Sequence, residues 1–267
     1  MYEQYYGLAE KPFSLTPDTE FFYQSFTHSE ALNVLLVAIR AGDGFIKVTG
    51  EVGTVKTLLC RKLLDALEYQ YDTVYIPNPY MDCNALLDAV VTEMGIADRL
   101  KKENYLACIN QKLIENARQG QGTVIILDEA QSLPEESLEA IRLLSNLETG
   151  KQKLVQIILF GQPELDARLA SSSIRQLQQR IMHAYQLQPL NLPSVRSYLQ
   201  HRVKSAGYRG PELFNSSAQR CIFRISQGIP RVINVLCNKA LMLSYASGDF
   251  YVNSKHIEAA AADTRQA

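Results

Sequence analysis

One short segment constrains the fold of this chain more than any other. Residues 47–58, KVTGEVGTVKTL, follow an apolar run typical of a buried strand and open a helical pattern. A glycine-containing turn in that setting can curl its backbone N–H groups around phosphate at the positive end of the helix. Gly50, Lys56 and Thr57 occupy positions that the P-loop pattern requires, GxxxxGK followed by Ser or Thr. The segment therefore predicts a phosphate-binding loop in a parallel α/β sheet.

The loop departs from that pattern at Val55, where a second glycine is expected. Glycine leaves space where phosphate approaches the backbone, whereas a β-branched side chain is bulky and stiff. We therefore expect Val55 to crowd the phosphates or open the loop, and so to weaken nucleotide binding. Lys56 should reach the β- and γ-phosphates, and the Thr57 hydroxyl should hold Mg²⁺. The residues predicted to surround the nucleotide phosphates are Gly50, Glu51, Val52, Gly53, Thr54, Val55, Lys56 and Thr57.

Apolar strand-like runs alternate with helical patterns over the first two thirds of the chain, which is typical of a parallel α/β sheet. The predicted strands are Phe45–Thr49, Thr73–Pro77, Thr123–Leu127, Leu154–Phe160 and Ala184–Leu187. Most are continuously apolar, as expected when helices cover both faces of the sheet in a three-layer fold. The predicted helices between them cover residues 56–70, 83–95, 103–119, 134–148 and 164–180.

The character of the sequence changes after Pro189. Helical patterns follow at residues 193–206, 215–227, 230–247 and 253–263, separated by turns rich in Pro and Gly. The sequence therefore predicts two domains. Residues 1–190 form a P-loop sheet domain, and residues 191–267 form a small all-helical lid.

Two carboxylates, Asp128 and Glu129, follow the third predicted strand. Charge at the end of a buried strand is costly unless it is used or paired. In a P-loop enzyme, Asp128 would hold Mg²⁺ through its water shell, and Glu129 would orient and polarise the attacking water. The alternative is a solvated strand end that leads into a helix.

Further polar residues are candidates for the same site. Gln162 follows the fourth strand and could sense the γ-phosphate or position water, or simply occupy a turn. An arginine that reaches the γ-phosphate of the next subunit is expected at Arg180 in preference to Arg175, although both could lie on a solvated helix face. Arg231 opens a helix of the lid, which suits a contact to the γ-phosphate in cis; the alternative is surface charge.

Composition limits the remaining classes of protein. The five cysteines are scattered and form no CxxC pair, which argues against disulfide or metal frameworks and favours a reducing compartment. No apolar run reaches the roughly 18 residues of a membrane span. Residues 1–180 carry 17 Lys and Arg against 24 Asp and Glu, whereas residues 181–250 carry 8 against 2. The basic region could face nucleic acid, anionic lipid or the acidic part of a neighbouring subunit.

Short motifs spread over almost the whole chain form a specific set: Tyr5–Leu8, Lys11–Phe13, Leu15–Asp18, His28–Leu32, Gly50–Thr54, Leu127–Gln131, Gly161–Leu165, Gln179–Ile181 and Gly228–Arg231. With this set the chain resembles the AAA+ ATPases of the general secretion pathway protein A (ExeA) family. The resemblance implies ATP and Mg²⁺ as ligands and nucleotide-dependent self-association. It also implies support for assembly of a type IV (MSHA-type) pilus or secretion machinery through inner-membrane proteins.

The resemblance further suggests that residues 1–30 pack near the nucleotide. Pro12 and Phe13 are candidates to lie beside the adenine, and plain core packing is the alternative for both. We expect a cytoplasmic protein that is peripheral at the inner membrane through its partners.

Two other functions remain open. Val55 could leave a nucleotide-poor scaffold for pilus proteins. The basic residues of the segment 181–250 could instead belong to a DNA-associated AAA+ ATPase. The near-neutral total charge and the absence of a cationic tail do not favour a nucleic-acid partner.

Overall fold

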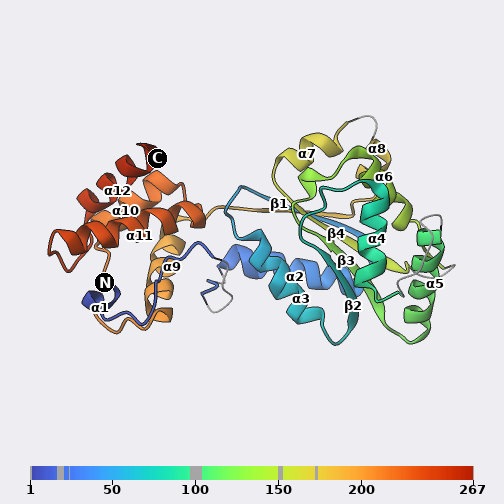
Figure 1. The fold of residues 1–267 in the computed structure, drawn as a ribbon, viewed down its shortest axis with the longest axis horizontal. Helices are drawn as coiled ribbons and strands as arrows, with labels where there is room; N and C mark the ends of the chain where they lie inside the picture. The colour runs from blue at the N-terminus through green and yellow to red at the C-terminus, as the bar shows by residue number, and fades with distance from the viewer. Residues whose placement is uncertain are drawn as a thin grey trace. The chain divides into compact units, whose positions relative to one another are not determined.

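The computed structural model describes residues 2–16, 21–23, 25–96, 104–149, 153–171 and 174–266, and it divides into two compact units (Figure 1). The sheet unit comprises residues 30–50 and 59–187. The helical unit comprises residues 1–29, 51–58 and 188–267. The predicted division at residue 190 stays a prediction about folding domains.

The sheet unit is built on five parallel strands in the order β2-β3-β4-β1-β5. They are β1 (Phe45–Gly50), β2 (Tyr71–Ile76), β3 (Gly122–Leu127), β4 (Val155–Gly161) and β5 (His183–Leu187). In the register, Val48 of β1 pairs with Phe160 of β4, and Ile126 of β3 pairs with Ile158 of β4. All five predicted strands are confirmed, to within two residues at each end.

Helices cover both faces of this sheet, which explains why its strands are apolar without alternation. On one face, Val124 and Ile126 pack in a cluster with α2 (Phe26–Ala41) and α3 (Lys56–Leu67). On the other face, Ile125 and Leu127 belong to a cluster with α4 (Cys83–Glu93), α5 (Tyr105–Arg118) and α6 (Glu135–Leu144). The predicted three-layer α/β architecture is therefore confirmed (Figure 1).

Two helical predictions need correction. The single helix expected at 164–180 is wrong, because α7 (Glu164–Leu169) ends at a cap on Ala170 and α8 (Arg175–Gln178) begins later. Ser171 follows the cap of α7, and a serine hydroxyl can compete with the hydrogen bonds of a helical backbone. Helix α2 was not predicted at all. Its signal is Ser25, whose Oγ accepts from the His28 N–H at 3.3 Å and caps the helix.

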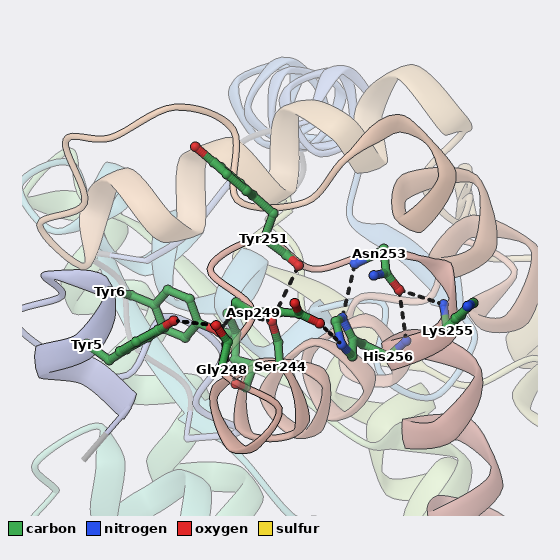
Figure 2. Close-up of polar contacts among 10 residues, drawn as sticks. Tyr5, Tyr6, Ser244, Gly248, Asp249, Tyr251, Asn253, Lys255 and His256 are labelled. Atoms are coloured by element: carbon green, nitrogen blue, oxygen red, sulfur yellow. Dashed lines mark hydrogen bonds and ion pairs between the residues drawn. The ribbon is translucent and has the colours of Figure 1, made fainter.

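The helical unit contains α9 (Leu192–Ser205), α10 (Ser216–Ser226), α11 (Pro230–Ala246) and α12 (Ser254–Gln266), close to the four helices predicted. The N-terminal helix α1 (Tyr2–Tyr6) packs in the same unit. Figure 2 shows the Tyr5 hydroxyl donating to the Gly248 carbonyl at 3.1 Å. In the same view Ser244 donates to the carbonyl of Asp249, whose carboxylate lies 3.2 Å from His256.

A buried arginine ties the N-terminal segment to α9. The guanidinium of Arg202 donates to the carbonyls of Pro12 at 2.5 Å and Ser14 at 3.2 Å, and it lies 4.7 Å from the centre of the Phe21 ring. Phe13 is 1% exposed and packs edge to face on Phe214 at 5.6 Å between ring centres. The helical core thus includes the N-terminal segment. The position of Pro12 and Phe13 relative to an adenine stays a prediction.

Candidate nucleotide site

The topology brings three predicted site residues to one edge of the sheet. β1 and β3 both run parallel to β4, which lies between them. Their carboxyl ends therefore meet at the same edge, where open α/β sheets bind ligands. Asp128 follows β3 and Gln162 follows β4, while β1 ends there at Gly50.

The two carboxylates after β3 differ in their surroundings. Asp128 is 2% exposed, and the Tyr75 hydroxyl donates to its Oδ2 at 3.5 Å. Burial, followed by the charge of Asp128, raises the pKa of Tyr75, so this hydroxyl stays a donor at neutral pH. Glu129 is only partly buried and has a φ of +52°, a left-handed conformation that few non-glycine residues adopt. That conformation turns the chain sharply from the strand into the short helix η2 (Ala130–Ser132).

Glu129 and Gln162 meet in the structure. The Gln162 Nε2 donates to Glu129 Oε2 at 3.1 Å. Gln131 joins them, because its Nε2 donates to the same Glu129 oxygen at 2.5 Å and its Oε1 accepts from the Gln162 N–H at 3.0 Å. Two predicted site residues are thus held together by an amide side chain to which we gave no role.

Arg168 of α7 supports this arrangement. Its guanidinium donates to the carbonyl of Gln131, within η2, and to the carbonyl of Leu133, which caps the end of η2. The sequence around Arg168 contains no motif that marks it, so only the fold identifies it.

The phosphate loop, Gly50–Thr57, leads from β1 into α3, so Lys56 and Thr57 stand at the start of a helix as predicted. Val55 has a φ of +68°. Within the loop, the Glu51 carbonyl accepts from the Thr54 N–H at 3.1 Å, the Thr54 hydroxyl at 2.8 Å and the Lys56 ammonium at 3.1 Å. The turn is therefore closed by its own residues, with valine in a conformation suited to glycine.

Two residues of the helical unit that lie outside the phosphate loop, Arg231 and His28, contact it. At the start of α11, the Arg231 N–H donates to the Gly53 carbonyl at 3.4 Å, and a Cβ on Gly53 would lie 2.6 Å from the Cβ of Arg231. Gly53 also has a φ of +85°, so both its backbone conformation and the close approach of Arg231 favour glycine at this position. His28 of α2 contacts the carbonyl of Thr54 at 3.1 Å through Nε2.

The two arginines considered for a contact between subunits differ in their exposure to solvent. Arg180 is half-buried, and its guanidinium donates to the Ser145 carbonyl at 3.5 Å. Arg175 is exposed in the first turn of α8. The role of either arginine stays a prediction.

Neither a metal cluster nor a membrane helix appears in the part of the chain that the structure describes. There, no group of three or more His, Cys, Asp and Glu residues could hold a metal ion. A magnesium–nucleotide site does not need one, because it uses one or two carboxylates together with phosphate oxygens. Within the same residues, no helix has both the length and the apolarity to cross a bilayer.

Comparison with known sequences identifies related proteins. Residues 39–169 match the family described as AAA domain. Over 265 residues, 98% of this chain, the sequence is 40% identical to general secretion pathway protein A of Aeromonas hydrophila, of which the match covers 48%. The chain thus spans about half the length of that curated relative.

Solved structures share the fold. Cdc6p of Pyrobaculum aerophilum matches with a TM-score of 0.68 at 16% identity, over 90% of this chain and 67% of that one. The Drosophila ORC structure bound to DNA matches with a TM-score of 0.70 at 16% identity, over 96% and 65%. The RuvB Holliday junction branch migration motor of Thermotoga maritima matches with a TM-score of 0.59 at 15% identity, over 90% and 72%. At these identities the likeness concerns the fold alone.

Proposed function

Because this chain is an AAA domain of the general secretion pathway protein A family, we propose that it binds ATP with Mg²⁺ and hydrolyses it, with turnover slowed by Val55. The observation that carries the proposal is the conformation of the phosphate loop. The chain keeps the left-handed turn at position 55 although a β-branched residue occupies it. Such strain costs about 1–3 kcal/mol and persists where the surrounding structure demands it, which is typical of functional sites.

The proposal assigns each step to residues of this chain. Lys56 and the loop N–H groups bind the β- and γ-phosphates. The Thr57 hydroxyl and the Asp128 carboxylate are oxygen donors of the kind that Mg²⁺ prefers, and bound Mg²⁺ would neutralise phosphate charge. Glu129 orients the attacking water and draws off its proton, while Gln162, hydrogen-bonded to Glu129, lies beside the γ-phosphate.

A turnover assay tests this proposal. The Val55→Gly protein should hydrolyse ATP faster than the unaltered chain, because the loop regains space beside the phosphates. Adding Glu129→Gln should lower its kcat by at least about a hundredfold, the usual range for a general base. Glu139→Gln, which alters an exposed carboxylate paired with Arg142 on α6, is the matched control and should change little. A Val55→Gly protein that is folded but inert with Mg²⁺ would refute the proposed hydrolysis.

At a finer level we propose that turnover serves assembly of a type IV (MSHA-type) pilus or a secretion machine, with inner-membrane proteins as partners. One support is the similarity to general secretion pathway protein A. The other is the motif set of the sequence, from which we propose a role like that of MSHA pilus biogenesis protein M. In this proposal the chain assembles with itself when nucleotide binds, and Arg180 completes the neighbouring site. Light scattering of the Val55→Gly protein with and without Mg²⁺-ATP tests this: a mass that does not change would count against it.

A nucleotide-poor scaffold is the second candidate, and the observation that favours it is the bulky valine side chain at a position where the phosphate-loop pattern has glycine. In that case the loop is a remnant that keeps its shape while the surface binds assembly proteins. Tight binding of Mg²⁺-ATP by the unaltered chain would exclude the scaffold. The third hypothesis is a DNA-associated ATPase, and its support is the net positive charge of segment 181–250.

A further inference from the structure

A buried histidine touches the phosphate loop from outside it. His28 lies in the first turn of α2 and is 4% exposed, and Thr54, its partner in the loop, is 2% exposed. The ring makes two polar contacts. Nε2 lies 3.1 Å from the Thr54 carbonyl oxygen, and Nδ1 lies 2.7 Å from the Ser25 hydroxyl. Both contacts join residues of the helical unit.

The chemistry of these partners fixes the tautomer of the ring. A carbonyl oxygen only accepts hydrogen bonds, so Nε2 must carry a proton. Burial lowers the pKa of His28, although the Thr54 carbonyl opposes that effect, and the neutral ring therefore has no proton on Nδ1. Nδ1 then accepts from the Ser25 hydroxyl. Ser25 in turn accepts from Thr27, whose Oγ1 lies 2.9 Å away.

This hydrogen bond controls the direction of one peptide group in the loop. The peptide between Thr54 and Val55 is planar and trans, so its carbonyl and its N–H point in opposite directions. Holding the Thr54 carbonyl against His28 therefore aims the Val55 N–H away from the histidine. The φ of +68° at Val55 belongs to the same turn. A phosphate loop binds through the directions of such N–H groups.

We propose that His28 is a positioning residue for the phosphate loop: its neutral imidazole fixes the peptide between Thr54 and Val55 so that the Val55 N–H points at the nucleotide phosphates. This inference rests on the proposed nucleotide binding. His28 itself touches no nucleotide and acts only through Thr54. It also links the cap of α2, through Ser25, to the loop that opens α3.

Two substitutions separate this role from simple core packing. His28→Phe keeps a ring of similar size and removes both polar contacts. His28→Gln keeps an amide donor that can reach the Thr54 carbonyl. Both are made in the Val55→Gly background, in which nucleotide binding should be strongest, and titrated with Mg²⁺-ATP and Mg²⁺-ADP. His256→Gln is the matched control, because His256 is similarly buried in the same unit but pairs with Asp249.

We expect His28→Phe to weaken binding of both nucleotides roughly tenfold, the usual effect of losing one buried hydrogen bond. His28→Gln should recover most of the affinity, and His256→Gln should leave it unchanged. Equal affinity in His28→Phe and its parent would overturn the inference. An equal loss in His28→Phe and His28→Gln would do the same, because packing alone would then explain it. If the Val55→Gly parent binds no nucleotide, the proposed function fails instead.

A second measurement covers the case in which His28→Phe does not fold. In the folded Val55→Gly protein, the imidazole ¹⁵N resonances of His28 should show a neutral ring protonated at Nε2. Mg²⁺-ADP should shift them while those of His256 stay in place. A ring protonated at Nδ1, or His28 resonances unaffected by saturating nucleotide, would contradict the proposal.

Discussion

Val55 stores strain that the rest of the loop has to hold. Strain at a β-branched residue with a φ of +68° lowers the free energy of unfolding by about 1–3 kcal/mol. Glycine removes this strain, but its greater conformational freedom in the unfolded chain lowers the free energy of unfolding by about 0.4–1 kcal/mol. Val55→Gly should therefore raise the free energy of unfolding by about 1 kcal/mol, as measured by urea denaturation.

The neighbouring valine provides the control for that experiment. Val52 is half exposed and is not among the residues with positive φ, so Val52→Gly relieves no strain. It should lower the free energy of unfolding by about 0.5–1 kcal/mol. Destabilisation of the protein by both substitutions would show that position 55 carries no strain.

His28 and His201 make stability depend on pH. Burial lowers the pKa of both side chains below the usual 6.5 or so, so the folded state binds their protons less readily than the unfolded state does. The contribution of the two neutral rings to the free energy of unfolding is therefore complete above about pH 6.5, the usual pKa of histidine. It is lost as the pH falls from there through the lower pKa values that the two side chains have in the folded state. Urea midpoints measured from pH 8 to pH 5 should fall accordingly. Replacing both histidines by glutamine should flatten the curve, and an unchanged curve would contradict this assignment.

At the scale of single elements, the strands were predictable and the N-terminal region was not. The strands are continuous apolar runs, such as that of β3, whose burial on both faces leaves a strong signal. Helix α2 was missed because its start depends on one serine hydroxyl and its apolar positions resemble many other segments. The helix expected at 164–180 was wrong because the helical periodicity of the sequence continues past Ala170, where the structure caps α7.

Some residues of the candidate site were predictable from the sequence, and others were not. Glu129 and Gln162 follow strands at sequence positions that a P-loop enzyme needs, and they meet in the structure. Gln131, Arg168 and His28 were not assigned roles, because each acts through a contact that only folding creates. No spacing rule along the chain connects them to the residues they hold.

We expect the hydrogen bonds from Arg202 of α9 to the N-terminal segment to contribute strongly to the stability of the helical unit. Arg202→Met keeps much of the aliphatic stem but leaves the carbonyls of Pro12 and Ser14 without their buried donor. We expect the free energy of unfolding to fall by about 3 kcal/mol. Arg196→Met, an exposed arginine on the same helix, should cost less than about 0.5 kcal/mol. Similar costs for the two would mean that the N-terminal segment is not held by Arg202.

At the scale of the whole molecule, charge argues against nucleic acid as the main partner. The net charge is −1, and segment 181–250 is net positive because it carries 8 Lys and Arg against only 2 Asp and Glu. Binding to duplex DNA depends on phosphate neutralisation and weakens steeply with salt. We expect no DNA mobility shift at about 0.15 M salt. A shift that persists there and declines steeply as salt rises would favour the DNA-associated alternative.

The central claim is that the turn from Gly50 to Thr57 binds a nucleoside triphosphate. Calorimetric titration with Mg²⁺-ATP tests it most directly, on the unaltered chain, on Val55→Gly, and on Val55→Gly with Lys56→Ala. The account predicts weak binding by the unaltered chain, affinity at least about tenfold higher in Val55→Gly, and loss of that gain with Lys56→Ala. Folded Val55→Gly protein that binds no ATP, or binds it equally well without Lys56, would contradict the account.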